Sequence, residues 1–214
     1  MSPNRIVATT IAAAAALLVS GSAVSAQSAW ETPMLLAPGS PEGIGIHLVD
    51  PEYEGVGALL TWRSAPFPVG VGFRVGLFDG ARSDLALSAG VDLGGELHRG
   101  DDDAPFDFVW FTGLGVGIDD WTVLSVPLGV SVGWSLGGDG VAFRPYVAPR
   151  LTLDAYLGDD DGPGERRGRD EDLDLDAALE LGADLAFSPS FVIRAAASFG
   201  GRDAVSIGIG LPGR

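Results

Sequence analysis

From Gly43 onward, apolar residues fill every second position in one segment after another. In residues 173–187 the odd positions hold leucine, alanine or phenylalanine, whereas acids stand at the even positions Asp174, Asp176, Glu180 and Asp184. A period of two is that of a β-strand, whose successive side chains point to opposite faces of a sheet. The chain is therefore expected to fold as strands, each with one apolar face and one face of polar or small residues.

Turn-forming sequences divide the chain into ten such segments, as at SAPFP (64–68) and GGDG (137–140). No strand–helix–strand rhythm accompanies them, which favours an all-β antiparallel meander. The connection at 98–107 is long for this pattern, so eight strands is the alternative count. The predicted strands are 43–49, 55–63, 69–78, 85–97, 108–118, 121–135, 142–157, 172–187, 191–199 and 204–211.

The N-terminal 42 residues do not share this pattern. Residues 1–26 are typical of a secretory signal peptide, with Arg5, an apolar stretch and Ala-Val-Ser-Ala before the cleavage point. An uncleaved anchor helix is the alternative, although the apolar stretch is short for a membrane span. Residues 27–42 contain several prolines and serines and are expected to form an extended N-terminal leader, followed by a barrel domain at 43–214.

The composition excludes several kinds of chemistry. The chain has no cysteine, so it forms no disulfide, thiolate metal site or cysteine nucleophile. Without the signal peptide it carries 12 arginines and 29 acids, a net charge of −17. This charge argues against a nucleic-acid partner and against attraction to anionic lipid surfaces.

Alternation alone does not say which face meets water. A soluble barrel buries its apolar face, whereas a membrane barrel turns that face to lipid. The polar face of two predicted strands is built from small residues, including Gly113, Gly115 and Gly117 in one and Gly129 and Ser131 in the next. A solvated strand face usually carries many charges, so small residues favour a crowded lumen and hence the membrane arrangement.

The polar face also carries both signs of charge. Acids and arginines that face a common lumen can pair, as buried charges require. The alternative is a solvated face with scattered charges. The predicted lumen-facing charge network comprises Arg63, Arg74, Asp92, Glu96, Arg144, Arg150, Asp154, Asp174, Asp176, Glu180, Asp184 and Arg194.

Aromatic residues give a third indication of orientation. If the C-terminus lies on the periplasmic side, seven aromatics fall on the apolar face near the periplasmic strand ends, where membrane barrels place an aromatic girdle. The alternative is ordinary enrichment of aromatics in strands. The same count puts the longest loop, 158–172, on the cell exterior. The predicted girdle comprises Trp62, Phe108, Trp110, Trp134, Phe143, Phe187 and Phe191.

The pattern over residues 43–211 resembles the small bacterial outer-membrane β-barrel proteins, described as porin-like or OmpA-like barrel domains. The resemblance rests on the signal sequence AAAAALLVSGSAVSA, the alternating strands and the final strand AVSIGIGLPG. Family members typically end in an aromatic residue that the barrel assembly machinery reads, whereas this chain ends in Leu211-Pro212-Gly213-Arg214. The resemblance implies outer-membrane lipid and that machinery as partners, and it implies no activity.

No catalytic, cofactor or metal site is predicted. His47 and His98 are the only imidazoles, and no local motif links them to the polar-face serines Ser88, Ser125 and Ser131. The acid runs at 101–103 and 159–161 do not have the spacing of an EF-hand and are expected to be solvated loops. The arginines of ERRGR (165–169) give the hypothesis that this loop binds lipopolysaccharide phosphates.

The sequence thus predicts an antiparallel up-and-down transmembrane β-barrel of about ten strands in a Gram-negative-type outer membrane. Barrels of this size usually fill their lumen with side chains, so a structural or adhesive role, or at most a narrow pore, is expected. An acidic excess in the lumen would make such a pore prefer cations. The alternative is a soluble periplasmic or secreted barrel that binds a small apolar ligand.

Overall fold

The computed structural model describes residues 30–51, 55–65, 68–79, 85–101, 105–118, 122–137, 140–157 and 173–213. The predicted signal peptide and the loop at 158–172, with Asp172, Arg166, Arg167 and Arg169, lie outside the described residues. Within the described ranges no helix is long and apolar enough to cross a bilayer, a finding that does not bear on crossing by strands.

The ten predicted strands are confirmed, with ends that differ by one or two residues. The sequence alternation extends through each of them, because each has one face toward the lumen and one away from it. An additional two-residue strand, β7, was not predicted. The strands are β1 Gly43–Pro51, β2 Gly57–Arg63, β3 Gly70–Phe78, β4 Ala86–His98, β5 Asp107–Ile118, β6 Thr122–Gly133, β7 Leu136–Gly137, β8 Ala142–Leu157, β9 Leu173–Ser188, β10 Phe191–Gly200 and β11 Ala204–Pro212.

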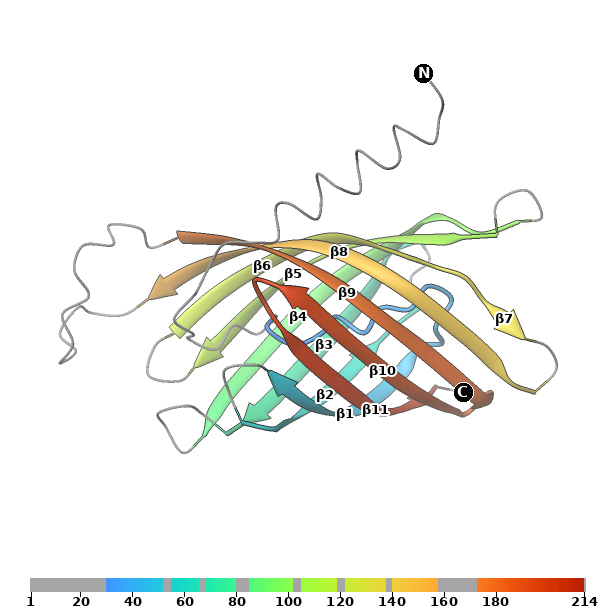
Figure 1. Cartoon of the computed structure of the whole chain (residues 1–214), viewed down its shortest axis with the longest axis horizontal. Helices are drawn as coiled ribbons and strands as arrows, with labels where there is room; N and C mark the ends of the chain where they lie inside the picture. Colours follow the sequence, from blue (N-terminus) through green and yellow to red (C-terminus); the bar gives the residue numbers. More distant parts are fainter. Residues whose placement is uncertain are drawn as a thin grey trace, which may run out of the picture.

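The ten long strands close into a barrel (Figure 1). Sequence neighbours pair in antiparallel fashion, β6 pairs with β8, and the first strand, β1, pairs with the last, β11. Each long strand therefore has two hydrogen-bonded neighbours, and β7 adds a short pairing to β8. The predicted fold class is confirmed and the eight-strand alternative is wrong, because the long 98–107 connection joins two genuine strands, β4 and β5.

The register around the ring sets the tilt of the strands. Paired residues on neighbouring strands can be followed from Ile46 to β8 in either direction around the ring. The path through β2 to β6 ends at Ala155, whereas the path through β11, β10 and β9 ends at Phe143. Such a stagger requires the strands to tilt by roughly 40° to the barrel axis. The tilt widens the lumen enough to hold more than strand side chains.

The two faces of the barrel are sharply different. The apolar parity points outward, with Leu48 at 61% and Leu175 at 64% exposure, whereas the charged parity points inward, with Glu180 at 0% and Asp184 at 2%. The soluble-barrel alternative requires the opposite arrangement. We name the two ends of the barrel by the strand ends there: the terminal end holds the start of β1 and the end of β11, and the loop end holds the end of β8 and the start of β9.

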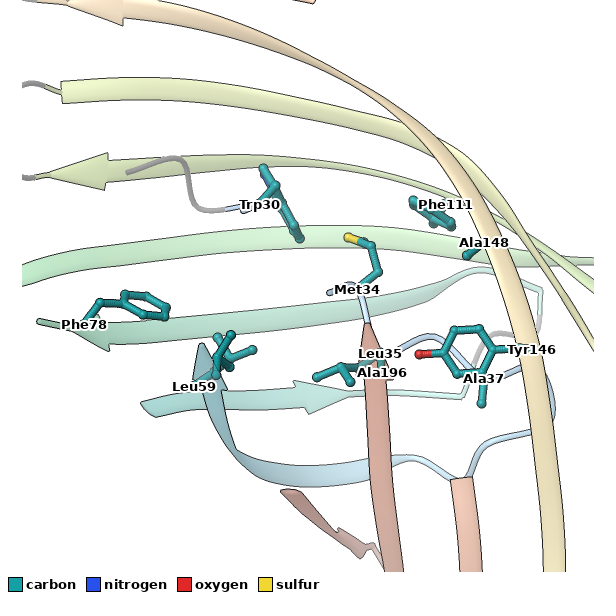
Figure 2. Close-up of a cluster of buried hydrophobic side chains, with 11 residues drawn as sticks. Trp30, Met34, Leu35, Ala37, Leu59, Phe78, Phe111, Tyr146, Ala148 and Ala196 are labelled. Carbon is teal, nitrogen blue, oxygen red and sulfur yellow. The ribbon is translucent and has the colours of Figure 1, made fainter. Parts of the chain in front are cut away.

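The core of the molecule lies inside the barrel and includes the chain before β1. Residues 30–42, hereafter the lumen segment, form no helix or strand and lie within the ring, drawn in blue in Figure 1. Trp30, Met34 and Leu35 are buried there against wall residues such as Phe111 and Tyr146 (Figure 2). Residues 30–42 of the expected N-terminal leader are therefore part of the interior.

Candidate functional site

The lumen segment follows the barrel axis for much of its length. Near the terminal end, the Ser40 hydroxyl donates to Asp184 and accepts from Arg194 (Nη2–Oγ 2.6 Å). Towards the loop end, the Trp30 indole N–H donates to the carbonyl of Ser125 at 3.2 Å. The segment thus occupies the path that an ion or solute would need to cross the barrel.

Glu180 of β9 holds the middle of the lumen segment. Its carboxylate accepts the backbone N–H groups of Met34 at 2.5 Å and Leu35 at 2.9 Å, and the Tyr146 hydroxyl at 2.6 Å. A buried carboxylate with three donors is well satisfied without a cation partner. A residue expected to face an arginine therefore binds the main chain of the segment.

Arg63 of β2 makes the complementary contacts. Its guanidinium donates to the carbonyls of Leu35 at 3.1 Å and Met34 at 2.9 Å, and it also pairs with Asp92 of β4 at 3.0 and 3.1 Å. Leu35 is thus fixed at both its N–H and its carbonyl. Its φ of 58° lies in the left-handed region, which a branched residue occupies only when its surroundings impose it.

Two further arginines bind the N-terminal part of the lumen segment. Arg74 of β3 donates to the Thr32 hydroxyl at 3.0 Å and to the carbonyls of Pro33 and Met34 at 3.2 and 3.1 Å. Its guanidinium also lies 4.4 Å from the centre of the Trp30 ring, a cation–π contact. Arg150 of β8 donates to the Thr32 carbonyl at 3.1 Å. Successive carbonyls from 32 to 35 are therefore all bound by wall arginines.

The small residues of the polar face make room for this segment. A Cβ added at Gly90 or Gly113 would lie 3.0 or 2.8 Å from Cζ2 of Trp30, closer than side chains normally approach. The Ser131 hydroxyl donates to the Leu36 carbonyl at 2.6 Å. The predicted crowded lumen is thus crowded by the segment as well as by wall side chains.

Arg202 is buried near the loop end of the lumen and was not predicted. It lies in the turn between β10 and β11, folds inward, and pairs with Asp154 and, at 3.3 Å, with Asp176. Burial lowers its pKa to about 10, so it remains charged at neutral pH. The alternation missed it because turn residues have no parity.

The predicted charge network divides into three groups. The first group forms ion pairs between strands, Arg63 with Asp92 at 3.0 Å and Arg194 with Asp184 at 3.2 Å. A second group contacts the lumen segment or Arg202. A third group stays outside the network. The second group is Arg74, Arg150, Glu180, Asp154 and Asp176, and the third is Glu96, Asp174 and Arg144.

The third group shows where the predicted network stops. Glu96 pairs with the exposed Arg99 at 2.7 Å at the terminal end, next to a register irregularity in β4. Asp174 accepts the adjacent N–H of Leu175 at 2.9 Å near the loop end. Arg144 is half-buried, and its Nη1 has no hydrogen-bond partner among the described residues. These three have lumen parity but lie at strand ends, where the lumen opens.

The seven predicted girdle residues lie close to the terminal end, half-buried or exposed. The ring centres of Trp62 and Phe73 lie 5.6 Å apart with the rings tilted to each other, and those of Phe187 and Phe191 lie 6.3 Å apart. Trp134 meets Phe106 edge-on at 5.7 Å. The positions form a band over several strands. The band contains Trp62, Phe108, Trp110, Trp134, Phe143, Phe187 and Phe191.

One cavity lies beside the lumen segment. A cavity of about 40 Å³ lies at the terminal end between the lumen segment and the walls, lined by Arg63, Asp92 and Arg194 among others. That volume holds about two or three water molecules. Among the described residues, the lumen segment and the wall side chains around it occupy the lumen.

The two histidines have different surroundings. Nε2 of His47, buried in the lumen, lies 3.4 Å from the Thr61 hydroxyl. His98 lies at the terminal end, 6.1 Å from the ring centre of Phe108. Within the described ranges, no group of three or more His, Asp or Glu is arranged to hold a metal ion.

Comparisons with known proteins give a distant likeness. No protein-family model matches the chain, and no curated protein matches it. Among solved structures, a KdgM porin in complex with disordered oligogalacturonate is 9% identical, with a TM-score of 0.43, over 80% of this chain and 99% of that one. A second KdgM porin structure is 8% identical with a TM-score of 0.40 over the same shares. A de novo designed transmembrane β-barrel is 12% identical with a TM-score of 0.30, over 81% and 98%. The strand pairings described above, rather than these likenesses, define the barrel.

Proposed function

We propose that the chain is a non-catalytic outer-membrane β-barrel protein whose apolar belt is covered by lipid. The observation that carries the proposal is the inversion of the two faces: leucines such as Leu48 and Leu175 are exposed, and carboxylates such as Glu180 are buried. An apolar surface that surrounds a whole molecule is unstable in water. A closed barrel satisfies its backbone internally and is one of two structures that can cross a bilayer.

Labelling of single cysteines tests this proposal, since the chain has none of its own. Leu181 lies on the outer face of β9, and Val56 lies in a connection at the loop end; both are exposed. In membranes, a membrane-impermeant thiol reagent should label V56C quickly and leave L181C unlabelled until detergent is added. Equal labelling of both variants in membranes contradicts the proposal.

We propose a narrow pore as the transport role of this barrel, closed in the arrangement described here. Near the loop end the lumen presents Asp154, Asp174 and Asp176 with Arg202, an acidic excess that favours cations. In a salt gradient across a planar bilayer, open events should show a cation-selective reversal potential, and D174N should reduce it. An anion-selective potential contradicts the preference.

A structural or adhesive role is the second candidate, and the filled lumen favours it. A barrel without a continuous channel still anchors its loops at the cell surface. The proposed contact of the 158–172 loop with lipopolysaccharide belongs to this candidate. Binding of lipopolysaccharide should fall when Arg166, Arg167 and Arg169 are replaced together by glutamine, and unchanged binding overturns that contact.

A further inference from the structure

We infer that the lumen wall is a binding site for a polypeptide backbone, and that residues 30–42 are its built-in, removable ligand. The inference rests on the proposed membrane barrel for its effect on conductance. The binding of residues 30–42 to the lumen wall does not depend on the membrane and can be measured separately.

The wall recognises the main chain of the lumen segment. Glu180 accepts two successive N–H groups, those of Met34 and Leu35, and Arg63, Arg74 and Arg150 donate to carbonyls. A carboxylate that accepts two successive N–H groups, and guanidinium groups that donate to successive carbonyls, fit a backbone that bends at Leu35, where φ is 58°. The chemical class of ligand is therefore a polypeptide segment.

Two side chains of the segment add specificity. The Trp30 ring lies over the small residues Gly90 and Gly113 and against Arg74. The Ser40 hydroxyl joins the Arg194–Asp184 pair at the other end. A ligand with an aromatic residue and a hydroxyl residue at this separation is thus held at both ends of the lumen.

The barrel does not depend on the lumen segment for its own backbone bonds. Every long strand pairs with two other strands, and residues 30–42 belong to none of the pairings. The segment contains Pro33, Pro38 and Pro41, which restrict its unbound conformations and lower the entropy cost of binding. The wall in turn holds Leu35 at its left-handed φ.

Departure of the segment would leave Arg74, Arg150 and Glu180 without the partners that they have in residues 32–35. The hydrogen bonds of Arg74 and Arg150 described above all go to residues 32–34. Without the segment, these guanidinium groups require hydration. A vacated lumen is therefore a water-filled lumen, and release of the segment opens the pore.

A cleavable full-length chain tests the inference. A site-specific protease sequence is inserted between the exposed Glu42 and Gly43, and the protein is folded into liposomes before it is cut. The fragment ending at Glu42 should then dissociate on washing, and conductance should rise at least tenfold over the uncut protein. A synthetic peptide of residues 30–42 should bind the cut barrel and close it again.

Each other outcome overturns a stated part of the inference. Retention of the fragment with no rise in conductance shows that the segment is not removable. Release without conductance shows that wall side chains alone close the lumen. Loss of the folded β-barrel signal in circular dichroism after cutting shows that the wall depends on the segment. Labelling of L181C in the same liposomes reports separately on the membrane barrel.

Backbone recognition is tested on the peptide, so that protein folding is not at issue. Methylation of the Met34 or Leu35 nitrogen removes one N–H that Glu180 accepts and leaves the side chains unchanged. Each methylation should weaken binding to the cut barrel about tenfold or more. Methylation at the exposed Gly39 is the matched control, and equal affinity of all three peptides overturns backbone recognition.

Discussion

Glu180 shows what strand parity does and does not determine for a single residue. Its even position among odd-numbered leucines placed it toward the lumen, and it is fully buried there. Its partners are two backbone N–H groups from a segment more than a hundred residues away and the Tyr146 hydroxyl. Parity assigns a face, but the partner depends on what fills the lumen, and no local pattern encodes that.

Replacing Glu180 with alanine should be strongly destabilising. Three buried donors lose their acceptor, and an unsatisfied buried donor costs about 1–3 kcal/mol. We expect E180A to lower the free energy of unfolding, measured by urea titration in lipid, by about 3 kcal/mol or more. D174A, at the strand end, should change it by less than about 0.5 kcal/mol. Similar losses in both variants contradict the assigned role of Glu180.

The space opposite Trp30 gives a second prediction. A methyl group at Gly90 would press on Trp30 Cζ2, at 3.0 Å, and overpacking costs about 1–3 kcal/mol. G90A should therefore be destabilising alone and much less so in combination with W30A, a coupling that a double-mutant cycle measures. G140A is the control, since nothing lies within 4 Å of its added Cβ. Additive effects of G90A and W30A contradict the position of Trp30.

At the scale of elements, strands were predictable and the lumen segment was not. Strands such as β3 and β10 carry their own period of two, and their observed ends fall within a residue of those expected. The lumen segment has no period, since its backbone bonds go to wall side chains. The run Met34-Leu35-Leu36 between Pro33 and Pro38, with Trp30 before it, is the one feature from which burial could have been predicted.

The turn between β10 and β11 contributes to stability through the ion pairs of Arg202. Its removal would leave Asp154 and Asp176 on neighbouring strands without their shared cation. Breaking a buried ion pair costs about 3–5 kcal/mol, so R202Q should lower the unfolding free energy by a similar amount. D154N added to R202Q should restore part of it, because one buried negative charge is then removed. No recovery in the double variant, measured by the same titration, contradicts this arrangement.

For the whole molecule, the strands of the barrel wall and the lumen segment are expected to open at different free energies. The ring is one hydrogen-bonded unit, whereas wall side chains hold the lumen segment from Thr32 to Leu36. Hydrogen exchange should therefore show strand amides opening with global unfolding and segment amides opening earlier, at lower free energy. Met34 and Leu35, whose N–H groups bond Glu180, should be the slowest of the segment. Segment amides as protected as β9 amides would show that wall and contents open together.

The seam between β1 and β11 has a consequence for the order of events in assembly. It joins the first strand to the last, so it closes only after every other strand has been made and placed. The lumen segment immediately precedes β1 and must be in position when that seam closes, or enter a finished ring from one end. When the seam closes, the lumen therefore either contains residues 30–42 or is empty. Which of the two results depends on whether residues 30–42 bind Glu180 and the arginines faster than β1 pairs with β11.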